Sequence, residues 1–234
     1  MTETTRRLVV TGAFASLAAS LSACVPASGP SGTAKPGTKP TAFAAIDPGF
    51  FSGDMYGAVT SEPFPVRAVA SSEVDPQFRR TVVSDPTGQK PGTIVIDPKA
   101  RYLYLVLNGG KAIRYGVGVG REGFQWNGTA VIHNKQAWPD WYPPKEMFLR
   151  QPEIKKSMTT LQSGIGMKGG PGNPLGARAM YLWKDNKDTL FRIHGTLEPS
   201  TIGKNVSSGC IRMVNQDVMD LYERVPVGTT VIVL

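Results

Sequence analysis

The pattern of hydrophobic and polar positions changes near Gly92, and from there on it predicts short β-strands. Four runs rich in β-branched, aliphatic and aromatic residues follow one another: Thr93–Ile96, Tyr102–Leu107, Ala112–Val119 and Gly128–His133. Turn sequences such as Asp97-Pro98-Lys99 and Asn108-Gly109-Gly110 separate them. Short runs bounded by such turns are typical of hairpins in an antiparallel sheet.

The next part of the chain predicts loops, a short helix and a further hairpin. Lys145–Met158 has helix-forming composition interrupted by a proline, whereas Gly164–Gly176 holds six glycines and two prolines and favours loop. Ala179–Trp183 and Thr189–His194 flank a polar segment and predict a hairpin that ends at His194. The aromatic side chains before this region either line a substrate cleft or pack beneath a loop: Trp138, Trp141 and Tyr142.

Near the C-terminus the apolar residues take up the spacing of a helix. The positions i, i+3, i+4 and i+7 hold Val218, Leu221, Tyr222 and Val225. They form one apolar stripe, and Asn215 before it is a residue type that favours the N-cap. Thr229–Leu234 then predicts a closing strand.

The N-terminus has the features of an export signal. Arg6 and Arg7 precede an apolar stretch, Leu8–Leu21, which is shorter than the roughly 20 residues of a transmembrane helix. A cysteine directly after small residues is similar to the lipobox of bacterial lipoproteins, so we expect residues 1–23 to be a signal peptide and Cys24 to be lipidated. The paired arginines leave both general secretion and twin-arginine export open.

Three further segments follow the signal. Residues 24–44 are rich in Pro, Gly and Ser and predict a flexible tether. Residues 45–90 show no sustained periodicity and are interpreted as an extended lead that packs onto the main domain. Residues 91–234 are expected to form that domain, which is mainly β with one or two short helices. Because Val25 is not the Asp of an inner-membrane retention signal, a lipid anchor in the outer membrane is favoured over the inner one.

Charge and motifs narrow the possible partners. The formal net charge is +8, and a basic exported protein is attracted to anionic polymers such as the cell wall. The export signal argues against nucleic acid. The sequence holds no His-x-x-x-His zinc pair and no Gly-x-x-x-x-Gly-Lys phosphate loop, so we expect no metal, nucleotide or other cofactor.

Of the two cysteines, Cys210 is the one available for chemistry. If Cys24 carries lipid, Cys210 has no partner for an intrachain disulfide. Arg212 offers a positive charge that lowers a thiol pKa, and the small residues before the cysteine let backbone amides approach a substrate oxygen. A nucleophile and a buried structural cysteine both remain open at this point.

A cysteine nucleophile needs a base, and the chain has two histidines. His194 lies at a strand end before Gly195, where an imidazole can project from a rigid edge toward a loop. His133 lies within a predicted strand, where the plain interpretation is a histidine satisfied by hydrogen bonds. His194 is therefore the better candidate for the base.

The two candidate residues lie in a recognisable pattern. His194-Gly195-Thr196, followed by Ser207-Ser208-Gly209-Cys210-Ile211-Arg212-Met213, resembles the signature of the YkuD-type L,D-transpeptidase family. The resemblance includes Pro171–Gly176 and covers about Gly92 to Leu234. It implies a mixed β-sheet or sandwich domain.

The resemblance also implies roles for individual residues. Cys210 is the implied nucleophile, His194 the general base and acid, and the backbone carbonyl of Gly195 the group that orients the imidazole. The amides of Gly209 and Cys210 are the implied oxyanion site.

Two positions depart from part of the family. Some relatives have His where this chain has Ser208, and Asn where it has Arg212, so the form found here resembles the Gram-negative branch. Both residues are implied to contact substrate. Without the second histidine, one imidazole has to perform all the proton transfers.

The implied substrate is a peptidoglycan stem peptide. Its diaminopimelate carbonyl would be attacked by Cys210, with release of D-alanine and formation of a thioester. The acceptor is left open: an amine of another stem, an amine of an envelope protein, or water in an L,D-carboxypeptidase. A hypothesis of a different class is a non-catalytic peptidoglycan-binding lipoprotein in the periplasm-facing cell envelope.

Overall fold

The computed structural model describes residues 54–121, 126–143, 145–150, 152–207 and 209–234. All of them belong to one of two compact units, Lys39–Leu234. The predicted signal peptide, the tether with Cys24, the first nine residues of the lead and Ser208 lie outside the described residues.

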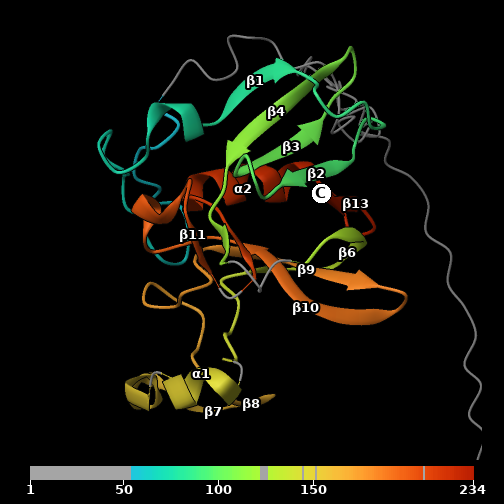
Figure 1. The fold of residues 1–234 in the computed structure, drawn as a ribbon. Coiled ribbons are helices and arrows are strands. Elements are labelled where there is room, and N and C mark those ends of the chain that lie inside the picture. Colours follow the sequence, from blue (N-terminus) through green and yellow to red (C-terminus); the bar gives the residue numbers. More distant parts are fainter. Residues whose placement is uncertain (1–53, 122–125, 144, 151, 208) are drawn as a thin grey trace, which may run out of the picture. The chain divides into compact units, whose positions relative to one another are not determined.

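A nine-stranded sheet forms the framework, in the order β1-β4-β3-β2-β13-β6-β9-β10-β12 (Figure 1). Its strands are β1 (Thr81–Ser84), β2 (Ile94–Asp97), β3 (Tyr102–Val106), β4 (Lys111–Gly116), β6 (Gly128–Ala137), β9 (Arg178–Lys184), β10 (Lys187–His194), β12 (Ile211–Arg212) and β13 (Thr230–Val233). The hairpins predicted from the alternating sequence are present as β2-β3-β4 and as β9-β10.

The sheet is mixed, because two of its pairings are parallel. The closing strand β13 runs antiparallel to β6 but parallel to β2, with Ile232 opposite Val95. At the other end, β12 runs parallel to β10. The mainly β, mixed-sheet fold with two α-helices among the described residues confirms the fold class expected from the sequence.

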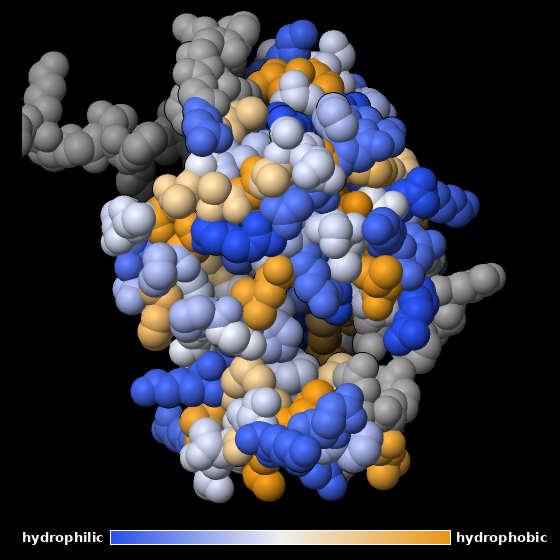
Figure 2. Space-filling view, turned by 90° about the vertical axis from the view of Figure 1, so that its left-hand side faces the viewer, coloured by the Kyte–Doolittle hydropathy of each residue, from blue (hydrophilic) through white to orange (hydrophobic). Residues whose placement is uncertain are grey.

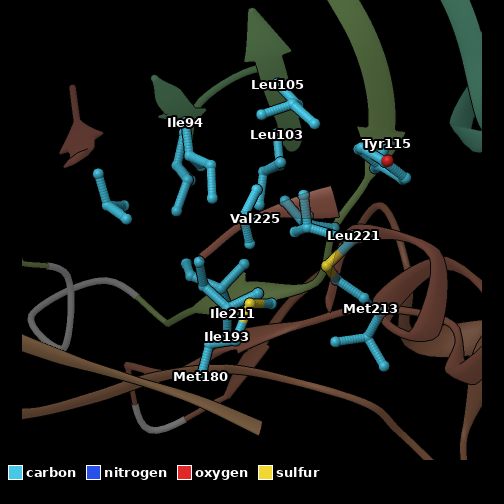
Figure 3. Packing of buried hydrophobic residues seen from close by; sticks show 14 of the residues in the cluster. Ile94, Leu103, Leu105, Tyr115, Met180, Ile193, Ile211, Met213, Leu221 and Val225 are labelled. Carbon is cyan, nitrogen blue, oxygen red and sulfur yellow. The ribbon is translucent and has the colours of Figure 1, made fainter. Parts of the chain in front are cut away.

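Strand β13 divides this sheet into two halves, β1-β4-β3-β2 and β6-β9-β10-β12. Helix α2 (Asn215–Arg224) lies between these two halves in Figure 1. The predicted stripe places Val218 and Leu221 in the core cluster, which also includes Leu103 of β3 and Ile193 of β10. Figure 3 shows Leu221 and Val225 between Leu103 above and Ile193 below. Burying side chains of this size typically contributes about 1.5–3 kcal/mol each.

The predicted N-cap at Asn215 is wrong. Val214 is the N-cap and makes no side-chain cap bond, and Asn215 is the first residue of the helix. Its side chain bonds two other segments: Oδ1 accepts from the amide of Ala177 at 2.9 Å, and Nδ2 donates to the carbonyl of Thr196 at 3.1 Å.

The described part of the lead packs onto the sheet and contributes to it. It contains a 3-10 turn, η2 (Pro76–Phe78), and the edge strand β1, which the sequence pattern did not predict. A second cluster of buried side chains joins the lead to the rest: Tyr56, Val74, Phe78, Ile202 and Val214. Glu62 of the lead pairs with the buried Arg178 on β9, with oxygen to nitrogen distances of 2.6 and 2.9 Å.

Short elements complete the fold. They are β5 (Val119–Gly120) paired with β11 (Asn205–Ser207), β7 (Thr159–Leu161) paired with β8 (Gly164–Gly166), helix α1 (Lys145–Arg150), and the 3-10 turns η3 (Pro152–Ser157) and η4 (Pro199–Thr201). Strand β8 corrects the prediction that Gly164–Gly176 is entirely loop. Such short strands in glycine-rich sequence show no period that a pattern can reveal.

The segment that holds α1, β7 and β8 lies below the sheet in Figure 1, and Figure 2 shows a hollow between this lower part and the body of the molecule. Within the described ranges, no helix is both long and apolar enough to cross a membrane.

Candidate active site

Two neighbouring parallel strands place the predicted nucleophile and base on one face of the sheet. In the β10–β12 pairing, Ile193 is opposite Ile211, and both side chains are buried in the core. Because side chains alternate along a strand, the residues on either side of these isoleucines point to the other face. His194 on β10 and Cys210 just before β12 therefore share that face.

The imidazole of His194 is buried, with 5% of the residue exposed, and it is fixed by its neighbour. Nδ1 lies 2.6 Å from the carbonyl oxygen of Gly195. Since a carbonyl can only accept, this contact assigns the proton of the neutral ring to Nδ1 and leaves Nε2 as the basic atom. Burial lowers the pKa of His194 to about 4, and the charges of Arg212 and Arg192 act in the same direction.

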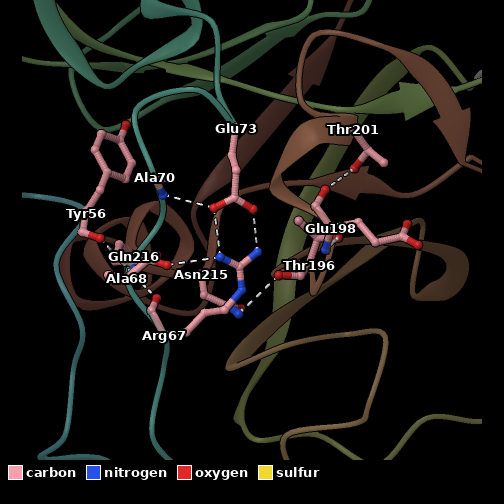
Figure 4. Close-up of polar contacts among 10 residues, drawn as sticks. All are labelled: Tyr56, Arg67, Ala68, Ala70, Glu73, Thr196, Glu198, Thr201, Asn215 and Gln216. Carbon is pink, nitrogen blue, oxygen red and sulfur yellow. Dashed lines mark hydrogen bonds and ion pairs between the residues drawn. The ribbon is translucent and has the colours of Figure 1, made fainter.

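Gly195 is required by close packing. A Cβ at this position would overlap the side-chain oxygen of Asn215. Asn215 in turn bonds the segment that contains Ala177 and, as Figure 4 shows, the segment that contains Thr196. The strand end at His194 is therefore tied to the start of α2. The sequence signalled Asn215 only as a helix cap, and its positioning contacts are long-range ones that no local pattern shows.

The turn before Cys210 is closed by one hydroxyl. Ser207 Oγ donates to the carbonyl of Cys210 at 2.6 Å and accepts from the amide of Gly209 at 3.1 Å. Gly209 has a φ of +119°, a conformation that favours glycine. Its amide, implied by the resemblance to bind an oxyanion, is thus bonded within the turn, so an oxyanion role would require that bond to be exchanged.

The thiol lies against the neighbouring strand β10. Cys210 Sγ donates to the carbonyl of Leu190 at 3.8 Å. Burial raises the pKa of the Cys210 thiol, and the charge of Asp188 raises it further. The backbone amide and the charge of Arg192 and the charge of Arg212 lower it in part. The resting state indicated by these shifts is a neutral thiol and a neutral imidazole.

A bulge in β10 brings the Leu190 carbonyl to the thiol. The register of β10 against β9 shifts between Asp188 and Arg192, and Leu190 has a φ of +63°, which is unusual for a non-glycine residue. Hydrogen bonds stabilise this conformation: the amide of Leu190 donates to Asp188 Oδ1 at 2.8 Å, and the Thr189 hydroxyl donates to the Leu182 carbonyl at 2.6 Å. Bulges beside active sites commonly redirect a backbone or side chain.

Arg212 is held on the same side as His194, its partner across the strand pair. Its Nη1 lies 3.2 Å from Glu198 Oε2, and its side chain is one quarter exposed. The backbone of Arg212 exchanges two hydrogen bonds with Gly118, which fixes the strand after the thiol. The guanidinium is therefore anchored at one nitrogen and keeps further donors for an anion.

The remaining candidates lie elsewhere or pack. His133 on β6 stacks on Trp183, with ring centroids 3.8 Å apart. Trp138 donates to Glu62 at 2.9 Å and packs edge-on against Phe64, so it fastens the lead. Tyr142 is 37% exposed. The described residues contain no group of three or more His, Cys, Asp or Glu side chains placed to bind a metal ion.

Comparison with known proteins gives the same assignment for the domain. The family model described as the YkuD L,D-transpeptidase catalytic domain matches residues 91–233. The chain is similar to the Probable L,D-transpeptidase YbiS of Escherichia coli K12, with 32% identity over 60% of this chain and 43% of YbiS. The Probable L,D-transpeptidase ErfK/SrfK of the same organism is 31% identical over 62% of this chain and 44% of its own length. The match thus spans less than half of each relative.

A solved structure is also similar in sequence. A crystal structure named as a Probable carnitine operon oxidoreductase caia from Brucella melitensis is 55% identical and covers 69% of this chain and 96% of its own, with a TM-score of 0.46.

Proposed function

This chain belongs to the YkuD L,D-transpeptidase catalytic-domain family, and from that membership we propose that it is a cysteine-dependent L,D-transpeptidase acting on peptidoglycan stem peptides. The observation that carries the proposal is the shared sheet face. The parallel pairing of β10 and β12 supports it, because Cys210 lies on the same face as the buried His194, whose Nε2 is basic.

The first half-reaction transfers the acyl group to the enzyme. Sγ of Cys210 attacks the carbonyl of the diaminopimelate residue while its proton passes to Nε2 of His194, and a tetrahedral intermediate forms. The intermediate then breaks its C–N bond. The leaving D-alanine takes the proton from His194, and a thioester remains on Cys210.

The second half-reaction reverses these roles. His194 removes a proton from the acceptor amine as the amine attacks the thioester carbonyl, and Cys210 leaves as thiolate and regains the proton. Because the one imidazole serves both halves, it has to begin each of them neutral. The lowered pKa of His194 meets that condition throughout the neutral pH range.

The tetrahedral oxyanion needs donors close to the thiol. The Cys210 amide is one candidate, and the Gly209 amide would become a second if it exchanged Ser207 for the substrate. Arg212 and the Ser208 position are proposed to contact the substrate, with Arg212 holding a carboxylate of the stem.

The cellular setting is part of the proposal. Lipidation of Cys24 would tether the enzyme at the periplasmic side of the cell envelope, with the outer membrane favoured by Val25. The acceptor amine would come from another stem peptide or from an envelope protein.

Incubation with muropeptides tests the proposal. The full chain is mixed with disaccharide tetrapeptides, and the products are analysed by mass spectrometry for a thioester on Cys210 and for cross-linked dimers. Trimmed stems without dimers would identify an L,D-carboxypeptidase. Neither adduct nor turnover, with retained muropeptide binding, would instead identify a non-catalytic binding protein.

A further inference from the structure

A cavity of about 540 Å³ lies on the same sheet face as the thiol, and the mechanism above does not use it. It is lined by His133, Asn134, Tyr181, Trp183, Asp188 and Arg192. These residues come from β6, β9 and β10 and face away from the core residues of the same strands. The cavity is therefore a feature of the sheet surface beside Cys210.

The strand registers align this cavity with the thiol. Asn134 is opposite Tyr181, and Tyr181 is opposite Arg192. Because Ile193 is opposite Ile211, Arg192 is level with Cys210. The four residues form one row across β6, β9, β10 and the start of β12, in which neighbouring strands are about 5 Å apart.

The cavity contains one charge of each sign, held side by side. Arg192 makes a bidentate ion pair with Asp188, with both N–O distances at 2.7 Å. The guanidinium lies over the ring of Tyr181, 4.4 Å from its centroid. This stacking and the β10 bulge keep the two charges in a fixed orientation, since the bulge amide at Leu190 also binds Asp188.

Both charged groups keep capacity for a ligand. Nη1 of Arg192 donates to Asp188 and to the Phe191 carbonyl, whereas Nη2 donates only to Asp188 within the part of the chain that the structure describes. Nη2 thus has a second N–H, and Asp188 Oδ2 accepts only one of these bonds. A ligand with a carboxylate and an ammonium on one carbon would match this pair in both charge and spacing.

We propose that this cavity is the subsite for the α-amino acid head of the acyl acceptor, an inference that rests on the proposed transpeptidase function. Arg192 binds the carboxylate and Asp188 holds the ammonium. The ammonium loses one proton to solvent before the neutral amine attacks the thioester, and His194 takes the second proton during the attack. The aromatic surface of Tyr181 and of the stacked His133–Trp183 pair packs against the methylenes of the acceptor. The row of residues sets the distance from this head to Cys210 at one to two strand spacings.

Ligands that lack either the carboxylates or the amines test the subsite without a change to the residues that line it. The full chain with Cys210→Ala, which prevents turnover, is titrated with meso-diaminopimelate and followed by NMR. Cadaverine has the same amines without the carboxylates, and pimelate has the carboxylates without the amines. We expect diaminopimelate to bind at least about tenfold more tightly than either, because each lost charge-assisted bond weakens binding.

Matched variants assign the binding to these residues. Arg192→Gln and Asp188→Asn should each weaken binding of diaminopimelate about tenfold, since each removes one of the two charges. Arg114→Gln is the control, because Arg114 also stacks on a tyrosine at 4.4 Å but lies on β4 in the other half of the sheet. The affinity of this control for diaminopimelate should stay within twofold of that of the Cys210→Ala chain. Thermal unfolding establishes that each variant is folded.

Three outcomes would overturn the assignment. The first is an equal affinity for diaminopimelate and for either cadaverine or pimelate. The second is an unchanged affinity in Arg192→Gln, and the third is failure of an acceptor tripeptide stem to displace diaminopimelate. The proposed function is judged separately by turnover of the wild-type chain. Turnover without binding here rejects the subsite alone. Binding here without turnover rejects the transpeptidase function and with it the acceptor role, and leaves only an amino-acid-binding cavity.

Discussion

Nδ1 of His194 lies 2.6 Å from the carbonyl oxygen of Gly195, the next residue in the chain, and the ring is almost completely buried. Burial is the main reason that the protonated ring is disfavoured, and the charges of Arg212 and Arg192 add to it. A carbonyl takes the place that a carboxylate has in many triads, and its hydrogen bond offsets only part of this effect. His194 is suited to hold a proton only during the reaction.

The pH profile of turnover should reflect this environment. Because burial lowers the pKa of His194 to about 4, kcat/KM should fall on the acidic side near pH 4 to 5 and not near the reference value of about 6.5. The raised pKa of Cys210 keeps the thiol protonated at neutral pH. The check is kcat/KM for muropeptides between pH 4 and 9, and an acidic limb centred at 6.5 would contradict the lowered pKa.

Cys210→Ala should abolish turnover while leaving the fold intact. The substitution removes the covalent step, but the side chain is partly exposed, so the free energy of unfolding should change by less than about 2 kcal/mol. Muropeptide products and thermal unfolding are measured on the same preparation. Cys24→Ser is the control, in which acyl labelling should disappear while turnover is retained.

Replacing Glu62 should be far more costly than replacing another ion-paired glutamate of the lead. Glu62→Ala leaves the buried Arg178 unpaired, which typically destabilises by about 3–5 kcal/mol. Glu73→Ala breaks the solvent-screened pair with Arg67, and the loss of such an exposed pair should change the free energy of unfolding little. Urea unfolding compares the two. Equal effects would show that the lead is not clamped at Arg178.

Leu190 should tolerate glycine better than valine. Its φ of +63° is readily adopted by glycine but disfavours a β-branched residue, and its side chain is 75% exposed. The free energy of unfolding of Leu190→Gly should lie within about 1 kcal/mol of the wild-type value, whereas that of Leu190→Val should be lower by about 1–2 kcal/mol. Thiol alkylation of the glycine variant should be unchanged, because the carbonyl that contacts Cys210 remains. The reverse order of stability would argue against the bulge.

Asp217 and Asp220, both on α2, should give stability opposite dependences on pH. Burial raises the pKa of Asp217 to about 7, despite the opposing charge of Arg80 and a hydrogen bond from Tyr56. The folded state thus binds more protons than the unfolded state between about pH 4 and 7. The contribution of Asp217 is present at low pH and is lost as the pH rises through this window.

The pKa of Asp220 is lowered. Burial alone would raise it, but the hydrogen bond from Arg224, the charge of Arg80 and the hydrogen bond from Tyr115 together outweigh that effect. Its contribution is present above the unfolded pKa of about 3.9 and is lost as the pH falls. Urea unfolding at pH 2.5, 4, 5.5 and 8 should show that wild type loses stability relative to Asp217→Asn as the pH rises from 4 to 8, by on the order of 3 kcal/mol. Relative to Asp220→Asn, wild type should lose stability as the pH falls from 4 to 2.5. Parallel slopes in both variants would rule out the assignment.

The elements that could be predicted are those long enough to show a repeating pattern of apolar and polar residues. The β9-β10 hairpin and the stripe of α2 repeat their periods over several residues and are found where the sequence predicts them. Strand β12 has two residues and cannot show a period. The parallel pairing of β2 with β13 joins residues more than a hundred positions apart, which no local pattern encodes.

The site divides in the same way. The pattern around Cys210 and His194 singled out both residues as candidates, and β10 and β12 lie side by side, but the catalytic roles stay predictions. The bulge could not be found, because Thr189 to Arg192 fits an ordinary strand in sequence and only the register shift and the αL conformation of Leu190 reveal the bulge. Asn215 was noticed for the wrong reason, since its amide group satisfies distant backbone atoms and not the helix end.

The position of β13 affects how the protein is made. This strand, the last element described, lies at the centre of the sheet and separates β1-β4-β3-β2 from β6-β9-β10-β12. During synthesis, both halves emerge before the strand that joins them, and a sheet that depends on such distant pairings folds slowly. The exposed edges of β2 and β6 are then open to a chaperone or to aggregation until residues 230–233 arrive.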